Sequence, residues 1–109
     1  MTEFVQIVTT VETAADAERI ATALLEQRLA ACVQIVGPIA SHYWWQGKIE
    51  QASEYQCLIK SRHELFAAVE AAIVAIHPYQ TPEILATPVV AGGAGYLAWL
   101  NTELRPEQP

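Results

Sequence analysis

Two long strand-like segments around the dipeptide Gln46-Gly47 constrain the fold of this chain more than any other feature. The first runs from Ala31 to Trp45 with a bend at Gly37-Pro38, and the second runs from Lys48 to Lys60. Glycine in a two-residue connection between such runs is typical of a β-hairpin. Strands of about fifteen residues span about 50 Å when straight, whereas a globule of this length is only about 34 Å across. We therefore expect the hairpin to bend sharply or to project.

The segments on either side of the hairpin complete a recognisable order of strands and helices. Strands are predicted over Glu3–Val11 and Ile84–Ala91, and helices over Thr13–Arg28, Ser61–Ile76 and Tyr96–Leu104. The resulting βαββαβ order with a terminal helix is typical of an α+β, ferredoxin-like domain. Right-handed crossovers place the first two helices on one face of the sheet. The other face is left bare and needs a partner.

Capping residues and apolar spacing support the predicted helices. Thr13 with Asp16 approximates a capping box, and Ser61 with Glu64 forms a full one, so we expect the second helix to begin there. Apolar residues then recur at helical spacing. The predicted buried faces comprise Ala17, Ile20, Ala21, Leu24 and Leu25; then Leu65, Val69, Ile73 and Ile76; and finally Tyr96, Trp99 and Leu100.

Composition narrows the function classes. The 109 residues are 52% apolar, which indicates one folded domain over residues 1–109, with 105–109 as a frayed tail. The net charge of −6 argues against nucleic acid and anionic membranes as partners. No apolar run is long enough to span a membrane, and the N-terminus lacks the features of a secretory signal. Cys32 and Cys57 are expected to be buried free thiols, which suits the cytoplasm.

The hairpin tip carries a concentration of aromatic residues. Tyr43, Trp44 and Trp45 are consecutive there, and tryptophan and tyrosine dominate protein–protein contacts. We interpret them as an anchor between subunits. The alternative is that the hairpin curls back and the rings join a local core.

The segment His77-Pro78-Tyr79-Gln80-Thr81-Pro82-Glu83 lies between a predicted helix and a predicted strand. Its two prolines stiffen the loop and fix its side chains, which favours a binding role over a simple rigid turn. His77 could ligate a metal together with Glu83 and water, contact an anionic ligand, or cap the helix C-terminus. Lys60, just before a helix N-terminus, could receive an anion or simply lie in water.

Motifs along nearly the whole chain resemble the CutA, or divalent-ion tolerance, family. They are Val8-Thr9-Thr10, Leu29–Val33, Ser41–Glu50, Ile59-Lys60, His77–Ile84 and Tyr96–Leu100. The resemblance implies a ferredoxin-like homotrimer with hairpins extending between subunits, related in architecture to PII-type nitrogen regulators. Copper-binding members have a cysteine at position 9 and histidines at positions 76 and 77. This chain has Thr9 and Ile76 and keeps only His77.

The function expected from these features is a cytoplasmic, non-catalytic trimer associated with divalent metal (copper) tolerance. It would bind or signal a small ligand or cation at clefts between subunits, and its only cofactor would be a divalent cation such as copper. The expected cleft residues are Tyr43, Trp45, Lys60, His77, Tyr79 and Glu83. Two alternatives remain, a direct copper-binding protein through His77 and a small cleft enzyme using His77, although no acid–base pair or catalytic triad is recognisable.

Overall fold

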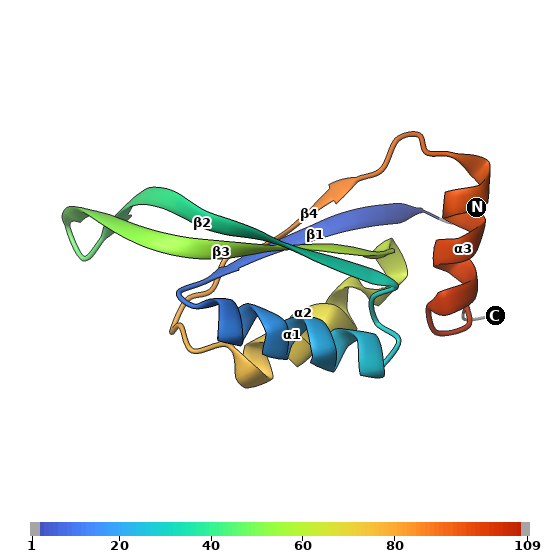
Figure 1. The fold of residues 1–109 in the computed structure, drawn as a ribbon, viewed down its shortest axis with the longest axis horizontal. Helices are drawn as coiled ribbons and strands as arrows, with labels where there is room; N and C mark the ends of the chain where they lie inside the picture. The colour runs from blue at the N-terminus through green and yellow to red at the C-terminus, as the bar shows by residue number, and fades with distance from the viewer. Residues whose placement is uncertain (1–2, 108–109) are drawn as a thin grey trace.

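A computed structural model describes residues 3–107 and shows a four-stranded antiparallel sheet in the order β2-β3-β1-β4 (Figure 1). The elements are β1 (Phe4–Val11), α1 (Ala14–Glu26), β2 (Cys32–Trp45), β3 (Lys48–Arg62), the 3₁₀ helix η1 (His63–Leu65), α2 (Phe66–Ile76), β4 (Ile84–Pro88) and α3 (Ala94–Glu103). Helices α1 and α2 lie on one side of the sheet. This arrangement confirms the α+β, ferredoxin-like prediction.

The core lies between the sheet and the helices α1 and α2. Alternate residues of β1 and β3 face the helices, as the two-residue period of a strand requires. The largest contributors are Ile7, Val11, Cys57 and Ile59 from the sheet, Ile20 and Leu24 from α1, and Val69 and Ile73 from α2. Burying each large aliphatic side chain contributes about 1.5–3 kcal/mol. This layer is what holds the body of the domain together.

The two predicted capping boxes have different outcomes. The Thr13 hydroxyl accepts a hydrogen bond from the Asp16 amide at 3.1 Å and starts α1 as expected. The prediction that Ser61 starts the second helix is wrong. Pairing with β1 continues β3 as far as Arg62, opposite Phe4, and the Ser61 hydroxyl donates to the Leu29 carbonyl at 2.7 Å. Pairing with β1 therefore holds Ser61 and Arg62 in the strand, although the local sequence favours the start of a helix.

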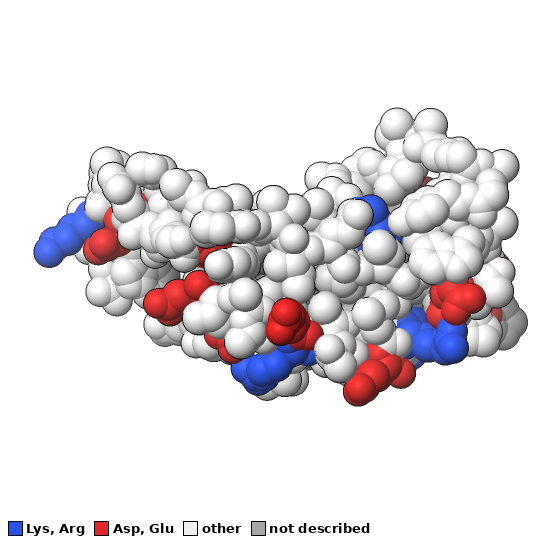
Figure 2. Space-filling model, in the orientation of Figure 1, with Lys and Arg blue, Asp and Glu red and all other residues white. Residues whose placement is uncertain are grey.

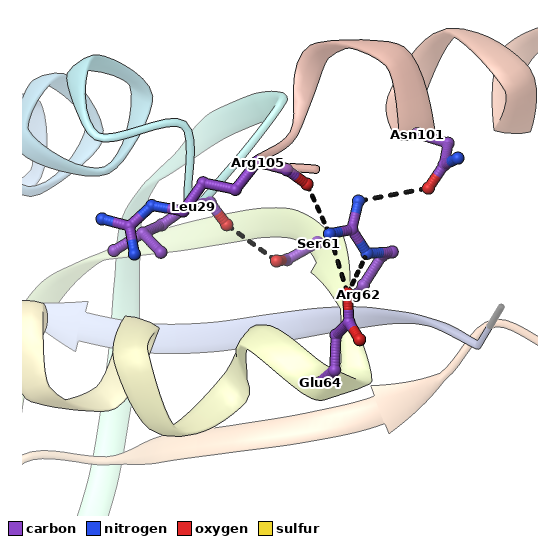
Figure 3. A network of polar contacts seen from close by, with 6 residues as sticks. All are labelled: Leu29, Ser61, Arg62, Glu64, Asn101 and Arg105. Atoms are coloured by element: carbon purple, nitrogen blue, oxygen red, sulfur yellow. Dashed lines mark hydrogen bonds and ion pairs between the residues drawn. The ribbon is translucent and has the colours of Figure 1, made fainter. Parts of the chain in front are cut away.

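A buried arginine, Arg62, connects the end of β3 to the C-terminal segment through hydrogen bonds (Figure 3). The Arg62 side chain is almost wholly buried and forms an ion pair with Glu64 at 2.9 Å. It also donates to the Asn101 side chain at 3.1 Å and to the Arg105 carbonyl. The Arg105 amide in turn donates to the Arg28 carbonyl at 2.9 Å. Arg105 is thus held in place, contrary to the frayed tail expected from 105 onward; residues 108 and 109 lie outside the described chain.

Helix α3 packs at one end of the sheet and buries less than its sequence suggested. Leu100 is buried as predicted, but Tyr96 and Trp99 remain 47% and 44% exposed. Their rings stack on each other, with centroids 5.7 Å apart, and not in the core. The helix covers only the sheet end (Figure 1), so these two rings stay about half exposed within residues 3–107.

The hairpin of β2 and β3 projects from the body and makes the molecule 46 × 26 × 22 Å in extent (Figure 1). Gln46 and Gly47 form its turn with positive φ angles of 51° and 80°. The expected irregularity at Gly37-Pro38 is present as a register shift between Val36 and Ile39. A side chain at position 37 would meet the Tyr55 ring at 2.8 Å, so glycine allows the two strands to approach there.

The two cysteines differ in environment. Both thiols are free, but only Cys57 is fully buried and Cys32 is half-buried. Burial raises the pKa of the Cys57 thiol to about 11. Cys57 therefore behaves as a small core residue, as predicted. Among the described residues, no helix is long and apolar enough to cross a membrane.

Candidate functional site

The candidate site lies on one face of the projecting hairpin. Tyr43 pairs with Glu50, and Ile39 with Glu54, in an uninterrupted register. Since side chains alternate along a strand and paired residues share a face, Tyr43, Glu50 and Glu54 share one face, together with Trp45. Trp44 falls on the opposite face and is 72% exposed. The structure therefore brings two predicted site residues, Tyr43 and Trp45, onto the same surface as two carboxylates.

Tyr79 joins this surface from the loop between α2 and β4. Its hydroxyl donates a 2.7 Å hydrogen bond to the Glu54 carboxylate, and Glu54 is only 6% exposed. The pKa of the Tyr79 phenol is raised, first by burial, then by donation to Glu54 and by the nearby Glu12 and Tyr43. Tyr79 is thus a permanent hydrogen-bond donor at neutral pH. This contact connects the proline-bounded loop to the hairpin.

His77 ends α2, but its ring binds β1 and not the helix carbonyls. The Tyr79 backbone amide donates to Nδ1 at 3.1 Å, which makes Nδ1 an acceptor. Nε2 then carries the proton and donates to the Thr10 carbonyl at 2.9 Å. Burial lowers the pKa of His77, opposed by Thr10, Asp16 and Glu54. The ring is therefore a neutral connector, which differs from the cationic helix cap considered from the sequence.

The described residues of one chain do not fit a copper site. Copper prefers thiolate or imidazole donors, but the Thr9 hydroxyl is buried and Ile76 is apolar. Both ring nitrogens of His77 already make hydrogen bonds. Within residues 3–107, no group of three or more His, Cys, Asp or Glu side chains could hold a metal ion. The chain therefore lacks the cysteine at position 9 and the histidine at position 76 that the family resemblance associates with copper binding.

Lys60 lies apart from this surface, whereas Glu83 belongs to the same loop as Tyr79. Lys60 donates to the Gln34 side-chain amide at 3.1 Å and is six residues from Glu54 along β3, about 20 Å in an extended strand. Glu83 is exposed near the start of β4. Of the six predicted cleft residues, one chain therefore gathers Tyr43, His77 and Tyr79 near Glu54. Trp45 shares their face but pairs with Lys48, six residues from Glu54, so Trp45 lies about as far from Glu54 as Lys60 does.

Sequence reasoning missed Glu54 as the centre of the site. Glu54 lies four residues after Glu50 on the same strand, and residues an even number apart on a strand share a face. The sequence was therefore sufficient to place both carboxylates on one face. The pairing of Tyr43 with Glu50 adds Tyr43 to that face. The burial of Glu54 depends on Tyr79, which lies 25 residues later in the chain. The backbone carbonyl of Thr10, which holds His77, leaves no signal in the side-chain pattern.

Comparison with known proteins supports the family resemblance. A sequence profile described as "CutA1 divalent ion tolerance protein" matches residues 5–103. The chain belongs to this family. Two curated CutA relatives, both called divalent-cation tolerance proteins, are 49% identical to this chain. The Pectobacterium atrosepticum protein matches over 82% of this chain and 81% of its own, and the Archaeoglobus fulgidus protein over 79% and 83%.

Solved CutA structures share the whole fold. CutA1 from Oryza sativa is 35% identical, superimposes with a TM-score of 0.93 and covers 96% of each chain. The CutA of Archaeoglobus fulgidus is 44% identical, has a TM-score of 0.89 and covers 96% of this chain and all of its own. That protein is described as periplasmic, so the cytoplasmic location expected from the sequence stays a prediction.

Proposed function

We propose that this CutA protein acts in divalent-cation tolerance as a non-catalytic homotrimer. Each trimer would bind a small ligand or cation at the clefts between subunits and signal its presence. The observation that carries the proposal is the projecting hairpin, whose tip exposes Tyr43, Trp44 and Trp45 together. An exposed aromatic surface of this kind marks an interaction site. A second copy of the chain is the partner implied by the family resemblance.

The proposed cleft combines residues that one chain gathers with residues that it keeps apart. Tyr43, His77 and Tyr79 would line one side around Glu54, with Trp45 farther out on the same face of the hairpin. Glu83 would contribute from the same loop as Tyr79, and Lys60 would complete the cleft from a neighbouring subunit. A buried carboxylate flanked by aromatic rings suits a positive group, supplied by a cation, by a small polar molecule or by the neighbouring subunit.

The alternatives have less support from the geometry. Direct copper binding through His77 would require breaking its hydrogen bond to Tyr79 or to Thr10. A catalytic role as a general base would need a free lone pair on the same ring, and Nδ1 already accepts the Tyr79 amide. We therefore favour binding over chemistry, and location in the cytoplasm remains part of the proposal.

Native mass spectrometry of gently purified protein tests the proposal. We expect complexes of three chains with an additional retained mass, which Glu54→Gln removes and the exposed control Glu18→Gln keeps. Equilibrium dialysis against CuCl₂ alone distinguishes this proposal from direct copper binding. Stoichiometric copper uptake by the wild-type protein that is lost in His77→Ala would favour direct copper binding. Single chains, or trimers whose retained mass is unaffected by Glu54→Gln, would contradict the proposed cleft.

A further inference from the structure

Glu54 is a buried carboxylate without an ion-pair partner among residues 3–107. Its hydrogen-bond donor is the neutral Tyr79 phenol, and none of the ion pairs within residues 3–107 includes Glu54. Removing a carboxylate from water without a cation is strongly unfavourable. This environment indicates that a positive group from outside the chain approaches Glu54.

Lys60, on the same strand, is a cation without an ion-pair partner among the described residues. Its ammonium group donates to the uncharged amide of Gln34 at 3.1 Å, and it is not part of the ion pairs of the described residues. Lys60 pairs with Cys32 on β2 and Gln6 on β1, so it lies on the sheet face opposite the buried Ile59. That face is the one that α1 and α2 leave uncovered (Figure 1).

The two groups cannot meet within one chain. Six residues of extended strand separate Glu54 and Lys60 by about 20 Å, which exceeds the combined reach of the two side chains. An ion pair between them therefore requires two copies of the chain. In the proposed trimer this contact is heterologous, because different surfaces of neighbouring copies meet, and repeating it around the axis closes a ring.

The shape and surface of the molecule suit such a head-to-tail contact. The hairpin tip lies at one end and α3 at the other, and a largely uncharged hollow separates them on the side away from α1 and α2 (Figures 1 and 2). Both ends expose aromatic rings, Trp44 and Trp45 at the tip and Tyr96 and Trp99 on α3. Seating the hairpin of one copy in the hollow of the next would cover rings from both ends.

We propose that Lys60 of the partner subunit pairs with Glu54 and supplies the missing charge at the Glu54–Tyr79 site. The inference rests on the proposed assembly and specifies which residue the second copy contributes. Each candidate cleft then contains Tyr43, Tyr79 and Glu54 from one subunit, with Trp45 farther out on the same hairpin face, and Lys60 from the next subunit. The site is incomplete in any single chain.

A double-mutant cycle tests this pairing. Glu54→Gln keeps an acceptor for the Tyr79 hydroxyl, and Lys60→Gln keeps the length and polarity of the side chain. We expect each variant to lower the Tm of the assembled protein and to raise the concentration at which subunits dissociate. The double variant should lower the Tm by no more than the larger single effect. Additive effects would overturn the pairing, because residues about 20 Å apart in one chain do not couple.

Zero-length carbodiimide cross-linking adds a readout that does not depend on stability. In a re-assembled mixture of light and ¹⁵N-labelled chains, we expect a cross-linked peptide joining Glu54 to Lys60, with one light and one heavy partner. Lys48, at the hairpin tip, serves as the control amine and should not link to Glu54. A wild-type protein that stays single would refute the proposed assembly itself. A trimer with additive variants and no mixed cross-link would refute only this pairing.

Discussion

The body of the domain and the outer half of its hairpin are parts of the same two strands, yet they differ in what their side chains contact. In the body, Cys57 and Ile59 are fully buried under α1 and α2. Farther along the hairpin, Ile49 and Trp44 are 64% and 72% exposed. Both regions are apolar in sequence, and only one has helices above it. The body therefore has its own core, whereas the outer hairpin exposes apolar surface, which we propose a second copy of the chain covers.

The junction between these regions is polar. At this point Tyr79 contacts Glu54 and His77 contacts Thr10, so the loop after α2 fixes the base of the hairpin to β1. Breaking contacts in the body, at the tip and at the junction should therefore have different consequences. The following predictions are ordered from the largest expected effect to the smallest.

A cavity in the body should destabilise every chain. Ile73 is fully buried between α2 and the sheet, so Ile73→Ala should lower the free energy of unfolding by about 2–5 kcal/mol. Val74→Ala, at an exposed position of the same helix, should change it by less than about 0.5 kcal/mol. Urea unfolding followed by circular dichroism measures both. Equal losses in the two variants would show that α2 is not packed as described.

Truncating the tip should affect assembly and leave the body folded. Replacing Trp44 and Trp45 with alanine removes the exposed rings, and residues that anchor an interface typically contribute 2 kcal/mol or more each. We expect the subunit dissociation concentration to rise at least tenfold, as measured by light scattering, with an unchanged far-ultraviolet spectrum. Leu25→Ala, on the outer part of α1, is the control and should keep the wild-type mass. A double variant of unchanged mass would refute the anchor role.

Removing one oxygen at the junction should have an intermediate effect. Tyr79→Phe deletes the donor to the Glu54 carboxylate, and hydrogen bonds to charged groups contribute about 1.5–3 kcal/mol. Tyr55→Phe is the matched control, since the Tyr55 hydroxyl makes no hydrogen bond within the described residues. Thermal unfolding should show a lower Tm for the first variant and little change for the second. Similar midpoints would mean that Glu54 does not depend on Tyr79.

The smallest expected effect is a pH dependence from His77. Burial lowers its pKa in the folded chain below the ordinary value of 6.5, so the unfolded chain takes up a proton more readily as the pH falls. The contribution of neutral His77 to the free energy of unfolding is therefore complete above about pH 6.5, and it is lost as the pH falls through and below that value. His77→Gln should flatten this part of the Tm profile between pH 8 and pH 5. His63→Gln, at an exposed position, should preserve it.

The sequence was sufficient to predict features that depend on neighbouring residues. The order of elements, the Thr13 cap and the irregularity at Gly37-Pro38 all follow from local pattern and backbone chemistry. The Ser61 cap failed because Arg62 pairs with Phe4, 58 positions earlier, which extends β3 through Arg62. Glu54 was missed for the same reason, since its burial needs Tyr79 from a distant loop. Tyr96 and Trp99 were expected to be buried because a helical stripe does not show what covers it.

The measurement that tests the central claim most directly is the solution mass of the wild-type protein over a dilution series, by sedimentation equilibrium. The chain has a mass of 12.0 kDa. The account predicts a species of three such chains that persists to low micromolar concentration, because the hairpin surface is then covered. A folded, well-behaved species of 12.0 kDa at the same concentrations would contradict the account.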